Sequence, residues 1–206
     1  MSNVLKRLAK AGNGRTMSDG ISSGAPRTLA VQCCIVGGGP AGMMLGYLLA
    51  RAGIRTAVLE KHADFFRDFR GDTVHPSTMK IMQELGLLDE FLKVPHQKIS
   101  HIEGLFGTTR IRLADVSRLK TPCPYVALMP QWDFLNFLES QCRKFANLQI
   151  MKSTEATGPV RKNGRVTGVR ARGQDGDLEI SADLTVACDG RHSLMREQAG
   201  LTAEDI

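Results

Sequence analysis

A glycine-rich turn between two apolar segments is the feature that most constrains how this chain can fold. The segment LAVQCCIV (29–36) has the character of a buried strand, and GGGPAG (37–42) follows it at once. Apolar residues at helical spacing continue to Gly53, and RTAVLEK (55–61) predicts a second strand that ends in Glu60. This order of strand, turn, helix and strand predicts a βαβ unit with the turn at the helix N-terminus.

The glycines of the turn fit G-x-G-x-x-G, a pattern typical of dinucleotide-binding sites. Gly37 allows the tight turn, Gly39 leaves the backbone open to a pyrophosphate, and Gly42 lets the helix pack closely. Glu60, 23 residues after Gly37, can accept the hydroxyl protons of an adenosine ribose and would repel a 2′-phosphate. The pattern predicts FAD or NAD rather than NADP, with a glycine-rich turn of another α/β protein as the alternative.

The part of the chain after Glu60 does not repeat regular βαβ units. Thr73–Pro76 predicts a helix start, and the short helix that follows is closed by Gly86. Residues 99–116 alternate as exposed strands do, and a further helix is predicted from Gln131. A plain NAD-binding domain would be more regular, so this stretch favours FAD.

The C-terminal part predicts a β-meander. After a return strand at 148–153, short strands from residue 155 onward are separated by the turn dipeptides Asn163-Gly164 and Asp175-Gly176. The last strand leads into Asp189-Gly190, and a helix is expected from His192. A meander inserted as a crossover in a dinucleotide fold also favours a flavoprotein.

Composition excludes several other classes of protein. The chain has 206 residues, of which 42% are apolar and 23% charged, and no apolar run is long enough to cross a membrane. Residues 1–16 carry four of the six net positive charges, so no nucleic-acid-binding surface is expected. Residues 1–28 lack the apolar core of a secretory signal and are predicted to be a disordered tail. The alternatives to a disordered tail are a weak organelle-targeting helix and a true start of the protein at Met17.

The cysteines and histidines give no sign of a disulfide or a metal site. The five cysteines are odd in number and form no C-x-x-C pair, and the five histidines are scattered. Small buried thiols are typical of a reducing compartment, so the cytoplasm is the predicted location.

Three motifs together resemble the class A FAD-dependent aromatic hydroxylases, the para-hydroxybenzoate hydroxylase family. They are GGGPAG with Glu60, FRGDTVHPSTM (69–79) and ACDGRHSLMR (187–196). The resemblance, which spans residues 30–200, implies an α/β, Rossmann-like FAD-binding domain of the glutathione-reductase type with an antiparallel β-meander crossover, incomplete at the C-terminus. This domain is expected over 29–206, with 97–130 beginning the substrate-domain strands.

The resemblance also implies further cofactor contacts. Arg70 matches a loop arginine near the flavin, Gln131 a contact to the FAD pyrophosphate or ribityl chain, and Asp189-Gly190 a fingerprint for FAD and NAD(P)H. The simpler alternatives are an exposed loop cation, a surface helix residue and a helix N-cap, respectively.

Three residues beside the turn and the acid complete the predicted contacts. Pro40 and Ala41 lie inside the turn, and Lys61 follows Glu60. No catalytic side chain is nominated, because the cofactor carries the chemistry in such enzymes.

The implied activity is NAD(P)H-dependent hydroxylation of an aromatic or related small molecule by an FAD monooxygenase, with oligomerisation left open. Family members continue from the Asp-Gly motif to a later Gly-Asp motif that this sequence lacks, so an N-terminal fragment is expected. One alternative is a truncated, non-catalytic nucleotide-binding module. Another is a flavin halogenase or reductase on the same scaffold, although the halogenase pattern W-x-W-x-I-P is absent.

Overall fold

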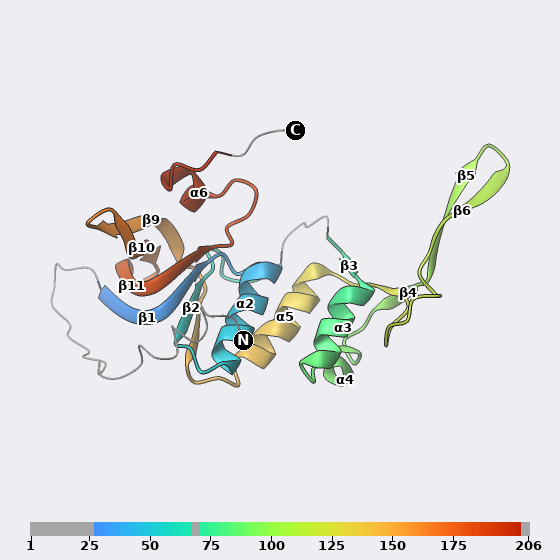
Figure 1. Cartoon of the computed structure of the whole chain (residues 1–206), viewed down its shortest axis with the longest axis horizontal. Coiled ribbons are helices and arrows are strands. Elements are labelled where there is room, and N and C mark those ends of the chain that lie inside the picture. The colour runs from blue at the N-terminus through green and yellow to red at the C-terminus, as the bar shows by residue number, and fades with distance from the viewer. Residues whose placement is uncertain (1–26, 67–70, 203–206) are drawn as a thin grey trace. The chain divides into compact units, whose positions relative to one another are not determined.

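The structure, a computed structural model, describes residues 27–66 and 71–202, and its chain divides into two compact units (Figure 1). One unit comprises Met1–Asp64 and Leu138–Ile206, and the other comprises Phe65–Phe137. The tail expected at 1–28 lies outside the described residues except for Arg27 and Thr28, which already belong to the first strand, so the predicted boundary is two residues late. Residues 97–130 lie in the second unit, and their assignment to a substrate domain stays a prediction.

The first unit is built on one mixed sheet of six strands. Their order across the sheet is β8-β2-β1-β11-β10-β9. Their bounds are β1 (Arg27–Val36), β2 (Thr56–Leu59), β8 (Leu148–Met151), β9 (Glu155–Lys162), β10 (Arg165–Gly173) and β11 (Gly176–Ala187).

The βαβ unit predicted from the glycine-rich turn is confirmed. Strand β1 pairs in parallel with β2 on one side and with β11 on the other, and β2 pairs in parallel with β8. Helix α2 (Pro40–Arg51) joins β1 to β2 and packs on β1, β2 and β8. Gly46 permits this approach, because a Cβ there would lie 2.9 Å from Cγ2 of Val58.

The predicted meander is confirmed in β9, β10 and β11, which pair antiparallel in sequence order. The turn between β9 and β10 places Asn163 at φ 51° and Gly164 at φ 75°, values that these two residue types tolerate. Strand β11 is long and bent (Figure 1), and it pairs with β10 at its start while running parallel to β1 along most of its length.

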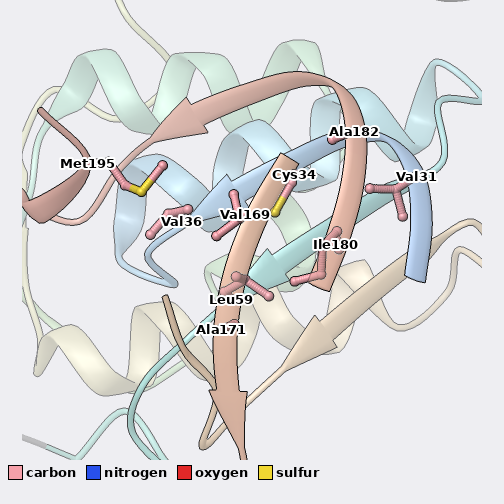
Figure 2. Packing of buried hydrophobic residues seen from close by; sticks show 10 residues of the cluster. Val31, Cys34, Val36, Leu59, Val169, Ala171, Ile180, Ala182 and Met195 are labelled. Carbon is pink, nitrogen blue, oxygen red and sulfur yellow. The ribbon is translucent and has the colours of Figure 1, made fainter. Parts of the chain in front are cut away.

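A compact apolar cluster holds the meander to the parallel strands. Figure 2 shows the side chains of β1, β2, β10 and β11 meeting there, together with Met195 of α6 (Leu194–Gln198). The buried members are Val31, Cys34, Val36, Ala57, Leu59, Val169, Ala171, Ile180, Ala182 and Met195. Helix α6 was expected from His192 but begins two residues later, because Ser193 accepts the backbone N–H of Arg196 as the N-cap.

The second unit contains two small antiparallel sheets and short helices. The strands are β3 (Thr73–Val74), β4 (Gln97–Ile99), β5 (His101–Phe106), β6 (Thr109–Asp115) and β7 (Val126–Leu128). The first sheet has the order β3-β7-β4, and β5 and β6 form a hairpin that confirms the exposed strands predicted at 99–116.

The helices of this region are α3 (Pro76–Glu84), α4 (Leu88–Phe91) and α5 (Gln131–Cys142), the last of which continues into the first unit. The expectation of a helix start at Thr73–Pro76 is wrong for its first two residues, which form β3. Pro76 disfavours a helical conformation at the residue before it, so His75 stays extended as the N-cap and the helix begins at Pro76.

Candidate cofactor-binding site

The turn after β1 can be made only with glycine at its first position. Gly37 has φ 107°, which side chains rarely adopt, and a Cβ there would lie 2.3 Å from the carbonyl oxygen of Cys188. Its N–H donates to the carbonyl oxygen of Leu59 at 2.8 Å. The turn is therefore wedged between the ends of β2 and β11.

Gly42 is equally constrained, but by the turn itself. A Cβ on Gly42 would lie 1.9 Å from the carbonyl oxygen of Gly37 and 3.3 Å from Cγ2 of Ile35. The first turn of α2 thus packs directly on the glycine turn and on β1, which is the role predicted for this residue.

Gly39 differs from its neighbours, because nothing in the protein fills the space beside it. No described atom lies within 4 Å of a Cβ built on Gly39, which has the extended angles φ −72° and ψ −176° as the N-cap of α2. Pro40 and Ala41 follow, both exposed. The N-cap makes no side-chain hydrogen bond to the helix, so the positive end of α2 faces an open space suited to an anion.

Glu60 lies directly after β2 and joins the second strand to the turn. Its side chain is buried, and one carboxylate oxygen accepts the N–H of Gly38 at 3.1 Å while the other accepts the N–H of His62 at 2.9 Å. A Cβ on Gly38 would lie 2.9 Å from the nearer oxygen, so a third glycine is needed for this contact. Gly38 is not a fixed position of the G-x-G-x-x-G pattern, and its place between two motif glycines was the available signal in the sequence. Lys61, the next residue, is exposed.

The loop after β8 supports the segment that carries Glu60. The N–H of Thr154 donates to the carbonyl oxygen of Glu60, and the N–H of Ser153 donates to that of His62, both at 2.9 Å. Ser153 has φ 51°, which lets the chain reverse at this point. The backbone that carries Glu60 is thereby held to the loop after β8, while its carboxylate is held by the N–H groups of Gly38 and His62.

Asp189 and Gly190 follow β11 and lie beside the same turn. The N–H of Cys188 donates to the carbonyl oxygen of Val36 at 2.7 Å, which brings the end of β11 to the glycine turn. One Asp189 oxygen accepts the hydroxyl of Ser193 at 2.5 Å, and the other accepts the N–H of Met195 at 3.1 Å. The simpler alternative for Asp189, a helix N-cap, is wrong in position, because the N-cap of α6 is Ser193. Asp189 nevertheless accepts an N–H of the first turn of that helix. Gly190 adopts φ 88°.

The structure does not test two of the predicted contacts. Gln131 belongs to the second unit, where a Cβ on Gly71 would lie 3.0 Å from its Nε2. Its Oε1 is buried and has no hydrogen-bond partner among the described residues. Arg70 lies outside the described residues, so its predicted role stays untested.

The thiols near the site are kept protonated by burial. Burial, with a smaller effect of Cys188, raises the pKa of Cys33 to about 11. Burial raises the pKa of Cys34 to about 12, with Cys33 as the secondary cause. Thiols of this kind are inert as nucleophiles and ligands at neutral pH. The described residues also hold no group of three His, Cys, Asp or Glu side chains placed to bind a metal ion.

The strand ends, the open helix N-terminus and the buried acid after the second strand together define a dinucleotide-binding α/β domain. Comparison with known proteins specifies it further. The chain belongs to the family described as FAD binding domain, whose model matches residues 30–205.

Several of the relatives are named as monooxygenases. The 6-methylpretetramide 4-monooxygenase of Streptomyces rimosus is 32% identical over 178 residues, which are 84% of this chain and 41% of that protein. The crystal structure of p-nitrophenol 4-monooxygenase from Pseudomonas putida DLL-E4 superposes with a TM-score of 0.75 at 26% identity, covering 87% of this chain and 46% of that one. The chain therefore spans less than half the length of these relatives.

A third structure shows how widely the fold is used. The myxobacterial chondrochloren halogenase has a TM-score of 0.72 at 20% identity, covering 82% of this chain and 39% of that one, which shows a shared fold alone. Within the described residues, none of the helices is both long and apolar enough to cross a membrane.

Proposed function

We propose that the turn at residues 37–42 binds the pyrophosphate of FAD and that Glu60 binds its adenosine ribose. The single observation that supports this most strongly is the contrast among the turn glycines. Gly37 and Gly42 are closed in by backbone atoms, whereas the position beside Gly39 is open at the positive end of α2. A pyrophosphate needs such an open backbone surface together with free N–H groups at a helix N-terminus.

Glu60 suits the ribose because its carboxylate is already oriented. Two backbone N–H groups hold its oxygens, and a carboxylate oxygen can accept more than one hydrogen bond. A 2′-phosphate would meet a carboxylate in a buried position, where like charges repel strongly. Pro40, Ala41, Lys61, Asp189 and Gly190 are proposed as neighbouring contacts, and Gln131 and Arg70 stay predictions from the family resemblance.

We further propose that the chain is the FAD-binding part of an NAD(P)H-dependent monooxygenase that hydroxylates an aromatic or related small molecule. The named relatives support this, because they are monooxygenases that share the domain. FAD would supply the redox chemistry with oxygen, while this part of the protein binds and orients the cofactor. The meander between the parallel strands supports a fold of the glutathione-reductase type, and a cytoplasmic location stays a prediction.

An equilibrium titration tests the cofactor assignment. The purified chain is titrated with FAD, FMN and NADP⁺, and binding is followed by flavin fluorescence or by calorimetry. FAD is expected to bind and FMN is not, because FMN lacks the adenosine ribose and the second phosphate that the turn and Glu60 recognise. Equal binding of FAD and FMN would contradict the proposal.

A turnover assay tests the proposed reaction separately. The chain is incubated with FAD, NADPH and a panel of phenols, and hydroxylated product is measured against NADPH consumed. Because the chain spans less than half of its relatives, we expect NADPH oxidation to be poorly coupled to product. Stoichiometric hydroxylation would show that this part alone shields the reacting flavin from water.

A further inference from the structure

The turn that follows β8, here called the β8 turn (residues 152–154), is fastened to the segment that carries Glu60. Its residues Thr154 and Ser153 donate their backbone N–H groups to the carbonyl oxygens of Glu60 and His62, both at 2.9 Å. Each of these bonds joins backbone to backbone, so the two segments move together. A shift of the β8 turn would therefore move the backbone from which the Glu60 carboxylate extends.

The β8 turn has a conformation that its residues do not favour by themselves. Ser153 has φ 51°, in the left-handed region that residues with a side chain seldom occupy. Such angles persist only where surrounding contacts hold them. Thr154 is buried, and its hydroxyl donates to the carbonyl oxygen of Lys152 at 3.1 Å, which closes the turn on itself. The side chain of Lys152 adds a contact to a different element.

Lys152 reaches from the β8 turn to a buried carboxylate on α5. Its Nζ lies 2.7 Å from Oε2 of Glu139, whose side chain is only 9% exposed. The side chain of Lys152 is 25% exposed, so the pair is largely shielded from water, where a charge-assisted hydrogen bond is strong. One turn further along α5, the buried thiol of Cys142 donates to the carbonyl oxygen of Met43 in α2. The carboxylate is therefore mounted on a helix that is itself packed within the first unit.

A second cation on α5 offers an internal comparison. Arg143 donates to the other oxygen of Glu139, also at 2.7 Å, but its side chain is 70% exposed. The two residues are four positions apart on one helix, so this pair ties α5 only to itself, and exposed pairs of this kind contribute little stability. Of the two cations, Lys152 is the one that joins α5 to the turn beside Glu60.

We propose that Lys152 is a positioning residue for the adenosine ribose, because its ion pair with Glu139 holds the β8 turn that places the Glu60 carboxylate. The inference rests on the proposed function, in which Glu60 binds this ribose. A hydrogen bond to a ribose hydroxyl weakens steeply when its distance or angle changes. Loosening the turn should therefore impair recognition of the hydroxyls more than binding of the phosphates, which lie at the glycine turn.

The ratio of the affinities for ADP and 2′-deoxy-ADP isolates this role. The two nucleotides share the pyrophosphate and differ by one ribose hydroxyl, so the ratio reports the contact to that hydroxyl. In calorimetric titrations, the wild-type chain is expected to bind ADP about tenfold more tightly. Lys152→Met keeps the length of the side chain without its charge and should reduce the ratio to about twofold or less. Lys152→Arg restores the charge and should keep most of the wild-type ratio.

Arg143→Met is the matched control, because it also removes a partner that lies 2.7 Å from Glu139. It is expected to leave the affinity ratio unchanged. Amide exchange followed by NMR gives a second readout that needs no ligand. The amides of Ser153 and Thr154, whose hydrogen bonds lead to the Glu60 segment, should exchange faster in Lys152→Met and at the wild-type rate in Arg143→Met.

The wild-type ratio separates the failure of this inference from that of the proposed function. Equal wild-type affinities for ADP and 2′-deoxy-ADP would remove Glu60 from the ribose, and the inference would fail with it. If the wild type discriminates and Lys152→Met does so equally well, or if Arg143→Met lowers the ratio as much as Lys152→Met, only the positioning role is overturned.

A second variant tests the same ion pair from its other side, in case Lys152→Met does not fold. Glu139→Gln keeps the shape of the side chain on α5 and removes the charge that attracts Lys152. It is expected to lower the ratio of the affinities for ADP and 2′-deoxy-ADP in the same direction. A wild-type ratio in Glu139→Gln would overturn the inference.

Discussion

Two alanine substitutions three residues apart, at Gly39 and Gly42, should separate the glycine that faces the proposed ligand from the glycine that is needed for packing. Gly42→Ala puts a Cβ 1.9 Å from the carbonyl oxygen of Gly37, whereas real Cβ contacts stay beyond 3.0 Å. The backbone must therefore move by about 1 Å at the most tightly packed point of the βαβ unit. A cost of about 3 kcal/mol in the free energy of unfolding is expected, at the upper end for overpacking.

Gly39→Ala should leave the free energy of unfolding nearly unchanged. The angles φ −72° and ψ −176° suit any residue, and the new methyl group meets no atom within 4 Å. Restricting the unfolded chain stabilises the fold by about 0.4–1 kcal/mol. Alanine is a poorer N-cap than glycine by a similar amount, about 0.5–1 kcal/mol. The two effects offset each other to within about 0.5 kcal/mol.

In contrast to its small effect on stability, Gly39→Ala should clearly weaken FAD binding. The methyl group of Gly39→Ala would occupy the space proposed for the pyrophosphate and push it away from the N-terminus of α2. Losing one charge-assisted hydrogen bond and part of the helix-end attraction costs about 2 kcal/mol, which is about 30-fold in affinity. Urea denaturation measures stability without ligand, and fluorescence titration measures FAD affinity. Wild-type FAD affinity in Gly39→Ala would refute the assignment of the pyrophosphate to this turn.

Three other perturbations follow from the geometry of the same site. Glu60→Ala should weaken FAD binding by about 1–3 kcal/mol and also lower the urea midpoint without ligand, since it leaves two backbone N–H groups unpaired; an unchanged FAD titration would remove this residue from the site. Asp189→Ala should destabilise the start of α6 by about 1–2 kcal/mol, measured as faster amide exchange in that helix, with Asp183→Ala, an exposed aspartate on β11, as the control. Burial raises the pKa of the Cys33 thiol to about 11 and of the Cys34 and Cys142 thiols to about 12, so none should react with iodoacetamide at pH 8 unless urea is added. The same shifts mean that the unfolded chain loses these thiol protons at lower pH than the folded one, so stability is full below about pH 9 and should fall as the pH rises toward 12; a urea midpoint that stays constant between pH 9 and pH 11.5 would contradict this.

The glycine turn shows how much a local pattern can determine. The order of strand, glycines, helix and acid is written in consecutive residues, and each element depends on neighbours within a few positions. The bounds of β1, α2 and β2 therefore fall close to those predicted, and Glu60 lies at the end of β2 as expected. The turn between β9 and β10 could also be predicted from the sequence, because Asn163 and Gly164 tolerate left-handed backbone angles that few other residues accept.

Errors in the predicted elements came from contacts between distant residues. Thr73 and Val74 have no local pattern that distinguishes a strand from a helix start, and it is pairing with Leu128 and Ala127 of β7 that makes them β3. Similarly, α6 begins later than predicted because Asp189 and Ser193 share the capping of its first turn.

The sequence by itself determined the βαβ unit and the meander, because helix and strand periodicity and glycine conformations are local properties. Only the tertiary structure decided that Gly37 is closed in, since the carbonyl oxygen of Cys188 comes from the distant segment after β11, and that the space beside Gly39 stays open. It also decided that Glu60 is held by backbone N–H groups and that β10 pairs with β11 only as far as Ser181. Those properties depend on which strands lie side by side, and strand order is set by packing over the whole sheet rather than by any one segment.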